Sequence, residues 1–196
     1  AGLNLTSVST NAIGIFQNSN FLETLNVSNW TFGTANTQLD SFLKSCMRLR
    51  SVTGLNSWSG TQYIKDLLEF MDGCTRIESV DLSSWTPSSC TRTREMFQNC
   101  TSLRSVDLSG WGDVSSVTDT TNMFYNCISL ETLLLGNQTW NISFSIANCS
   151  FDSTNLDSIY TSLATVSGKT ITVTGNLGTG GDDPTIATNK GWTVTG

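Results

Sequence analysis

Apolar and polar positions repeat along this chain about every 27 residues as far as residue 149. Each copy opens on a small residue, and three positions later an apolar residue begins a Leu-x-x-Leu-x-Leu spacing. Self-similarity at such a period is typical of units that stack and bury their core against neighbouring copies. The small residues form one column of the repeat: Ser19, Cys46, Cys74, Cys100 and Cys127, at intervals of 27, 28, 26 and 27 residues.

The leucine spacing predicts one short strand in each copy, and the strands should stack in parallel. The second copy has Gly54 in the third apolar place and its tryptophan one residue late, which predicts a β-bulge there. Each copy then returns through a pair of apolar residues just before the column residue, such as Met96-Phe97, where we expect a helical turn. The predicted strands are residues 22–27, 49–54, 77–82, 103–108 and 130–135, and the tryptophans that follow them are Trp30, Trp58, Trp85, Trp111 and Trp140.

The two ends of the chain depart from the repeat. Residues 1–20, in which Leu3, Leu5 and Val8 alternate with polar residues, are expected to form a lead-in cap over the open end of the stack. After residue 150 a helix capped by Asp152 is followed by strands at residues 169–175 and 192–195. We expect these strands to continue the parallel sheet as two shorter βα coils, so residues 1–149 and 150–196 form one continuous domain.

The segments SVDLSGW, SSVTDTTNMFYNC and SLETL are similar to the BspA-like leucine-rich repeats of bacterial surface proteins. The similarity covers about residues 12–149, with Thr120 standing where the family usually has Met and Ser19 where it has Cys. The resemblance implies an α/β solenoid, a right-handed parallel stack of about five leucine-rich repeats, exposed on a surface for adhesion or recognition. The ending A-T-N-K-G-W-T-V also resembles the endings of repeat-bearing surface and phage proteins, so a phage fibre or virion protein is an alternative setting.

Composition favours an extracellular, cell-surface or virion-surface location. Charged residues make up only 13% of the chain, whereas Ser and Thr number 56 and make the surface polar through hydroxyl groups. The net charge of −6 and the lack of a basic patch argue against nucleic acid as a partner. No apolar run is long enough to insert in a membrane. Because the chain begins at Ala1, we expect one domain of a longer protein.

The residue types needed for common catalytic and metal sites are missing. The absence of histidine excludes Ser-His and Cys-His nucleophiles, so we expect neither an enzyme nor a cofactor. No C-x-x-C spacing occurs, and we expect no metal site, although Asp182 and Asp183 leave calcium as a minor alternative. Neighbouring column cysteines fall within disulfide reach, but small buried thiols are the favoured interpretation. Cys90 and Cys149 lie off the column and are expected to be exposed.

The strand residues that point away from the core form three columns that offer candidate sites. Glu and Arg alternate in the first column, which predicts an inter-coil charge ladder with pairs worth about 0.2–1 kcal/mol each. Hydroxyl and acidic residues fill the other two columns and could contact a glycan or an extended peptide. The predicted ladder is Glu23, Arg50, Glu78, Arg104 and Glu131, and the predicted ligand-binding residues are Thr53, Ser79, Asp81, Ser105 and Asp107.

Two classes of function compete on this evidence. The first is a recognition or adhesion module that binds a host-surface glycan or protein through the strand face. The second is a structural component of a virion, tail fibre or filament, which assembles with sister subunits or attaches to a longer particle. Asp81 and Asp107 also occupy equivalent places in adjacent strands, as a glycosidase pair might, but repeat symmetry explains their spacing without catalysis.

Overall fold

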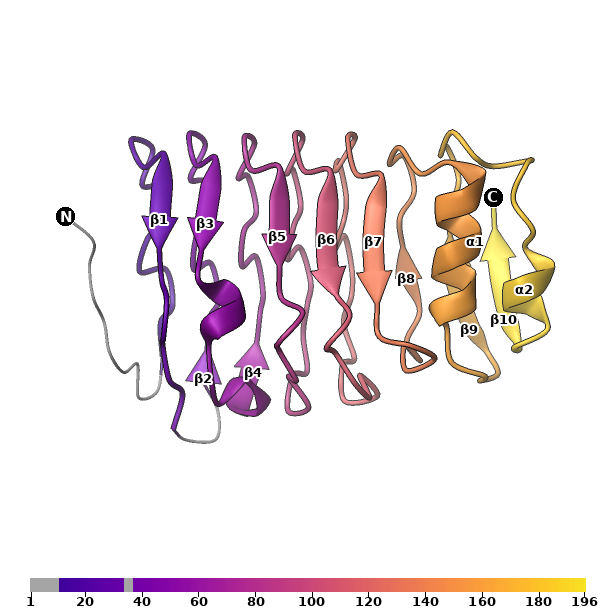
Figure 1. The fold of residues 1–196 in the computed structure, drawn as a ribbon, viewed down its shortest axis with the longest axis horizontal. Coiled ribbons are helices and arrows are strands. Elements are labelled where there is room, and N and C mark those ends of the chain that lie inside the picture. Colours follow the sequence, from indigo (N-terminus) through magenta and orange to yellow (C-terminus); the bar gives the residue numbers. More distant parts are fainter. Residues whose placement is uncertain (1–10, 34–36) are drawn as a thin grey trace.

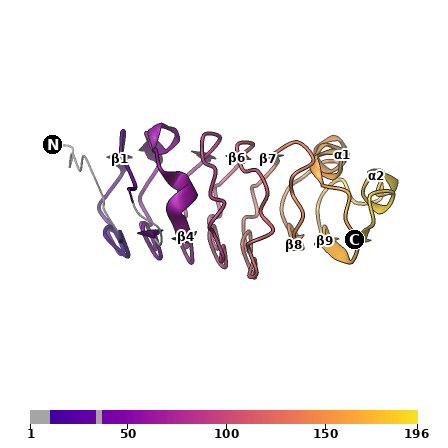
Figure 2. The same cartoon turned by 90° about the horizontal axis from the view of Figure 1, so that it is seen from below.

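The computed structural model describes residues 11–33 and 37–196, so Leu3, Leu5 and Val8 of the expected cap lie outside the described residues. The chain winds through a row of coils from the first strand to the C-terminal helices, and each coil adds one layer (Figures 1 and 2). One side of the row carries a strand from each repeat, which we call the strand column. It comprises β1 (Thr24–Asn26), β3 (Ser51–Thr53), β5 (Ser79–Asp81), β6 (Ser105–Leu108) and β7 (Thr132–Leu135).

Equivalent repeat positions pair in parallel along the strand column. Leu25 lies opposite Val52, and Val80 lies opposite Val106, as the aligned copies predict. The pairing is nevertheless interrupted, because β1–β3 and β5–β6–β7 are separate sheets and no strand pairing joins β3 to β5. The strands therefore pair in parallel as predicted within each sheet, but they do not form one continuous five-strand sheet.

The interruption follows directly on the irregular second copy. The predicted bulge is absent, since β1 and β3 pair without a register shift. The extra residue is taken up after the strand, where Gly54 has a φ of +87° and leads into the 3-10 helix η1 (Leu55–Ser57). A second such helix, η2 (Thr61–Tyr63), follows. A Cβ atom at Gly54 would lie 2.5 Å from the backbone nitrogen of Ser28, so only glycine fits against the preceding coil.

The opposite side of the row, which we call the return column, carries strands running the other way (Figure 1). Parallel bridges through Arg92 and Asp119 extend its pairing from β4 into the next two coils. The C-terminal strands were expected to continue the strand column, but they pair with β8 and extend the return column instead. The return column comprises β2 (Thr37–Gln38), β4 (Ile64–Asp66), β8 (Phe144–Ser145), β9 (Lys169–Thr172) and β10 (Trp192–Thr195).

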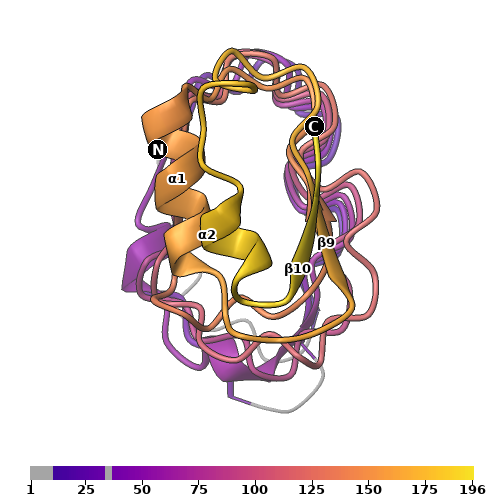
Figure 3. The same ribbon diagram turned by 90° about the vertical axis from the view of Figure 1, so that its right-hand side faces the viewer.

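Helix α1 (Ser153–Ser162) explains this change of side, because it occupies the strand-column position beside β7 (Figures 1 and 3). Its first turn is capped as predicted, since the Asp152 carboxylate accepts a hydrogen bond from the Asn155 backbone N–H at 2.8 Å. Helix α2 (Thr185–Thr188) packs against α1 and β10. The last two coils are therefore helix on one side and strand on the other.

The apolar pairs of the returns from Phe42-Leu43 to Met123-Phe124 are buried, whereas Ile15 in the first return is exposed. The helical turn expected at these pairs does not form. Each return contains two residues with left-handed backbone four positions apart, such as Glu95 with a φ of +57° and Asn99 with a φ of +59°. These residues break the helical path, and alternate N–H groups point along the stack. The Phe97 N–H donates to the Met123 carbonyl of the next coil at 3.0 Å, for example. Backbone hydrogen bonds thus join the returns of successive coils.

Aromatic rings stack along the core of the row. Trp30 and Trp58 lie 5.2 Å apart with their planes nearly parallel, and Trp85 continues the stack 5.1 Å from Trp58. Buried indole N–H groups need acceptors, and those of Trp58 and Trp85 donate to carbonyls of the preceding coil at 2.6 and 2.8 Å. Since Trp30 and Trp58 each contact the tryptophan of the next coil, burial is shared between neighbours as repeat stacking requires.

Candidate functional site

The predicted ligand-binding residues lie on the outer face of the strand column. Ser79 is in register with Ser105, and Asp81 is in register with Asp107. Thr53, Ser79 and Asp81 are exposed, while Ser105 and Asp107 are half-buried. The structure therefore places all five side chains on one face, as the alternation of strand residues predicts.

A hollow of about 250 Å³ opens where the strand column is interrupted. Val52 and Thr53 of β3 line one side, and Asp81 of β5 lines the other. Gly54 and two residues of helix η1, Leu55 and Asn56, complete the lining. Two of the predicted residues, Thr53 and Asp81, thus meet at a concave place created by the missing strand pairing.

The acidic residues of this face also have a structural role that the sequence did not reveal. Asp81 Oδ1 accepts hydrogen bonds from the Ser83 N–H at 2.9 Å and its hydroxyl at 2.6 Å, and Oδ2 accepts from the Asn56 amide at 2.9 Å. The bonds from Ser83, followed by that from Asn56, hold the pKa of Asp81 below its usual value although burial opposes them. Asp107 Oδ1 likewise accepts from the Ser109 N–H at 2.8 Å. Each of these two carboxylates therefore closes the turn that ends its strand.

The predicted charge ladder is in register but forms only one ion pair in the described part of the chain. Arg104 Nη1 lies 3.7 Å from Glu131 Oε1, and both side chains are at least half exposed. Glu23, Arg50 and Glu78 form no ion pair with any residue in ranges 11–33 and 37–196. A single exposed pair at this distance contributes about 0–1 kcal/mol, so the alternation adds little stability.

All six cysteines are free and buried. Each column thiol donates to a backbone carbonyl of the preceding coil, as Cys100 Sγ does to the Met71 carbonyl at 3.2 Å. The expectation for Cys90 and Cys149 was wrong, because both are buried and Cys149 Sγ lies 4.0 Å from the Phe124 carbonyl in the same repeat relation. Burial raises the pKa of Cys90 and of Cys149 to about 12, so neither thiol is poised to react.

Acidic residues do not converge on a metal site in the described part of the chain, which contains no cluster of three or more potential ligands. Asp182 Oδ2 accepts from the Tyr160 hydroxyl at 2.6 Å, and Asp183 Oδ1 accepts from the Thr185 N–H at 3.0 Å. These contacts tie the C-terminal turn to helix α1 and to the start of α2.

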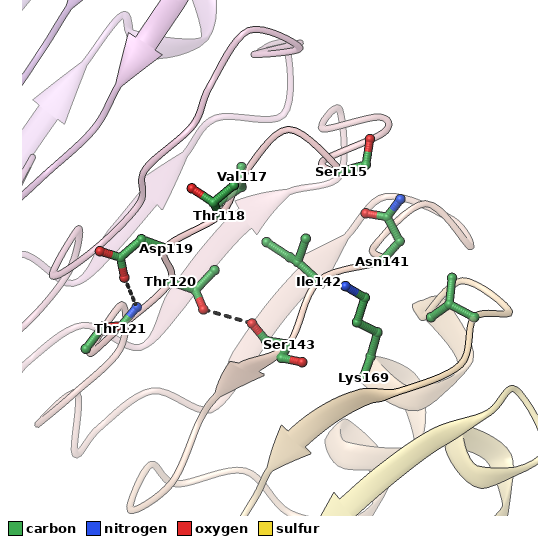
Figure 4. A pocket seen from close by; sticks show the side chains of 11 residues that line it. Ser115, Val117, Thr118, Asp119, Thr120, Thr121, Asn141, Ile142, Ser143 and Lys169 are labelled. Atoms are coloured by element: carbon green, nitrogen blue, oxygen red, sulfur yellow. Dashed lines mark hydrogen bonds between the residues drawn. The ribbon is translucent and has the colours of Figure 1, made fainter.

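A larger hollow, of about 620 Å³, lies in the return column between the coil of residues 115–121 and strands β8 and β9 (Figure 4). We call it the return groove. The sequence analysis missed it, although one signal was present: Cys149 follows Cys127 after 22 residues, whereas the preceding intervals are 26–28. Its lining includes Asp119, Thr120, Asn141, Ile142, Ser143 and Lys169.

Coils joined by in-register parallel pairs, with an aromatic stack inside and polar faces outside, define this molecule as a repeat protein. It belongs to the family described as "Mycoplasma protein of unknown function, DUF285", which matches residues 10–140. This is a surface-repeat family related to the BspA-like repeats. Comparison with curated proteins and with solved structures finds no match. None of the helices in the described part of the chain has the length and hydrophobicity that a membrane crossing requires.

Proposed function

We propose that this protein is a non-enzymatic recognition module, a right-handed leucine-rich-repeat solenoid displayed on a cell or virion surface. It binds a host-surface glycan or protein through the strand column. The observation that carries this function is the hollow between β3 and β5, where Thr53 and Asp81 face one concave space. Membership of a surface-repeat family supports the display on a surface.

The chemistry of the hollow suits a ligand rich in hydroxyl groups. Asp81 is held in its charged form by its hydrogen bonds and remains an acceptor, while the Thr53 hydroxyl can donate or accept. Ser79 and Ser105 extend a strip of small polar side chains along the neighbouring strands. A ligand anchored in the hollow would therefore find further hydrogen-bond partners along the stack.

Assembly into a fibre or particle is the second candidate function. Strand β10 pairs with β9 on one edge and with no other strand in the described part of the chain. An unpaired edge presents backbone groups to which another strand can add. A sister subunit could continue the return column there. In that case the hollow in the strand column would not be needed for function.

Filling the hollow tests the recognition function. Thr53→Trp places an indole in the space that a ligand would occupy, and we expect at least about a tenfold loss of binding to a panel of immobilised glycans and host-surface proteins. Ser89→Trp, an equally bulky change at an exposed turn residue, is the matched control and should bind normally. Equal binding by the Thr53 variant would contradict the strand-column site. If the native protein forms a regular polymer and the Thr53→Trp variant still forms it, assembly is the favoured function.

A further inference from the structure

The return column is interrupted between two neighbouring coils. In the coil of residues 93–99, the N–H groups of Thr93, Glu95, Phe97 and Asn99 donate to carbonyls of the following coil at 2.9–3.0 Å. The equivalent donors one coil later are Thr120, Asn122, Phe124 and Asn126. In the described structure none of these four N–H groups donates to the coil of residues 141–149. Side-chain contacts span the junction instead: the Thr120 hydroxyl donates to the Ser143 carbonyl at 2.8 Å, the Asn141 amide donates to Asp113 Oδ1 at 2.9 Å, and Cys149 Sγ lies 4.0 Å from the Phe124 carbonyl.

Both hollows on this side of the row lie along the same interruption. The return groove has Thr120 on one wall and Ser143 on the other, and a smaller hollow of about 70 Å³ continues between Asn122 and Ser145. Because unpaired backbone N–H groups seek acceptors, the junction offers a row of donors to a bound molecule. Hydroxyl groups of several threonine and serine side chains add donors and acceptors around them.

The return groove contains an unpaired cation. Lys169, the first residue of β9, extends along the groove toward Ile142 and Asn141 (Figure 4). Its amine forms no hydrogen bond or ion pair among the described residues, although the chain has a net charge of −6. The nearby acidic residue, Asp119, already accepts from the Thr121 N–H at 3.0 Å. An anionic group on a ligand would give Lys169 the partner that the protein does not provide.

The smaller hollow is lined by an aromatic ring. Tyr125 lies beside it and is 61% exposed, whereas most other large aromatic side chains of the repeats are buried. An exposed ring next to hydroxyl and amide groups can stack on the apolar face of a sugar ring. Ile142 and Val166 add apolar surface at the other end, where Lys169 is found.

We propose that this junction binds a glycan that carries a carboxylate, with the carboxylate at Lys169 and the sugar ring packed toward Tyr125. The backbone donors of the interrupted coil bind the sugar oxygens between them. The site lies in the return column, so it is separate from the strand-column site and does not depend on it. A carboxylated sugar fits because it combines one anionic group, many hydroxyl oxygens and apolar ring faces.

Matched monosaccharides test the proposal directly. Methyl β-D-glucuronide and the methyl α-glycoside of N-acetylneuraminic acid are titrated into the isotopically labelled protein, with methyl β-D-glucoside as the neutral counterpart. At least one acidic sugar should shift the backbone amide resonances of Thr120, Asn122, Phe124 and Asn126, and it should bind at least about tenfold more tightly than the neutral sugar. Acetate serves as the anion without a sugar ring and should not shift the amides near Tyr125.

Two variants assign the contacts. Lys169→Gln should weaken the acidic sugar by about tenfold and leave the neutral sugar unchanged, whereas Tyr125→Ala should weaken both. Lys65→Gln, an exposed lysine of β4, and Thr53→Trp in the strand column should leave this binding unaltered. The proposal is overturned if neither acidic sugar shifts these amides, if the neutral sugar binds as tightly, or if Lys169→Gln binds the acid as well as the wild type does. Loss of binding with Thr53→Trp alone would also overturn the separation of the two sites.

Discussion

At the scale of single residues, polar side chains on this repeat serve their own backbone before any ligand. Asn26, Asp81 and Asp107 stand at the same repeat position, and each accepts from the N–H two residues later at 2.8–2.9 Å. In these three strands the bond closes the turn that follows, whereas Thr53 and Leu134 occupy the same register position in β3 and β7. A ligand that binds Asp81 must therefore share the carboxylate with the hydrogen bonds of the turn.

Unlike these turn-closing carboxylates, the carboxyl group of Asp40 lies next to another acidic residue. Asp40 lies beside the buried carboxylate of Asp66, which is paired with Arg92. Burial, followed by the charge and hydrogen bonding of Asp66, raises the pKa of Asp40 to about 7, while Arg92 partly offsets this. Asp40 Oδ1 is buried without a partner in the described structure. The folded protein consequently holds a proton that the unfolded chain releases at lower pH.

Asp40→Asn should therefore stabilise the protein above neutral pH. The raised pKa means that the free energy of unfolding falls as pH rises from about 4 to about 7, where the folded state alone retains the proton. Removing the titration should increase stability at pH 8 by on the order of 1 kcal/mol, after allowance for partial solvent screening, with little change near pH 4. Urea denaturation across this pH range measures the effect.

Asp81→Asn provides a control of opposite sign. The lowered pKa of Asp81 contributes stability above the unfolded pKa, which is lost as pH falls through the folded pKa. The variant should be less stable than the wild type at neutral pH, and the difference should vanish in acid. Parallel pH profiles for the two variants would contradict the assigned environments.

At the scale of elements, helix α1 is held at both ends by specific polar contacts. Asp152 caps the start, and Lys190 from the last coil donates to the carbonyls of Tyr160, Thr161 and Leu163 at 3.3, 2.5 and 2.8 Å. The last carbonyls of a helix have no N–H donor within the helix, so a cation placed there can bond to several of them at once. This contact fastens the terminal coil onto the helix.

Lys190→Met should loosen the C-terminal coil selectively. The methionine keeps most of the apolar side chain but removes the charged donor, and we expect a loss of about 1–2 kcal/mol. Amide hydrogen exchange should become faster in α1 and β10 and remain unchanged in β1 and β3, because contacts in a stack are made only between neighbours. Lys65→Met, on the exposed side of β4, is the control and should change neither region. Uniformly faster exchange would show that Lys190 acts on the whole stack.

At the scale of the whole molecule, the tryptophan stack continues across the gap in the strand column. Trp58 and Trp85 remain 5.1 Å apart across the junction at which β3 and β5 fail to pair. The indole N–H of Trp85 also donates to the Leu55 carbonyl across that junction at 2.8 Å. The core thus remains continuous where the sheet is not.

Trp85→Ala should accordingly destabilise the middle of the row. Loss of a fully buried indole in a well-packed core typically costs about 3–5 kcal/mol. Because the ring bridges an interrupted junction, the denaturation curve should broaden or split as the N-terminal and C-terminal coils separate. Trp192→Ala, in the last coil, should cause only local fraying. A single sharp transition with unchanged midpoint in the Trp85 variant would show that other contacts join the halves.

Much of the fold could be predicted from local pattern. The positions of the strands, the register between copies, the buried tryptophans and the cap at Asp152 all follow from spacing that recurs in the sequence. The five predicted strand-face residues lie on one face because side chains alternate along a strand. The right-handed solenoid and the ligand-binding role of that face remain predictions.

The rest depended on contacts between coils. Sequence spacing shows which positions are equivalent in successive copies. It does not show whether the backbones of neighbouring coils are close enough to pair. Both hollows lie at junctions where the backbones do not pair. The left-handed backbone of the returns does not follow from residue type, since residues as unlike as Ser41, Glu69 and Asn122 share it. The sequence by itself determined the repeat, the core and the polar face. Tertiary structure decided where strand pairing is interrupted and which column the last strands join, because both depend on the length of chain in the adjacent coil.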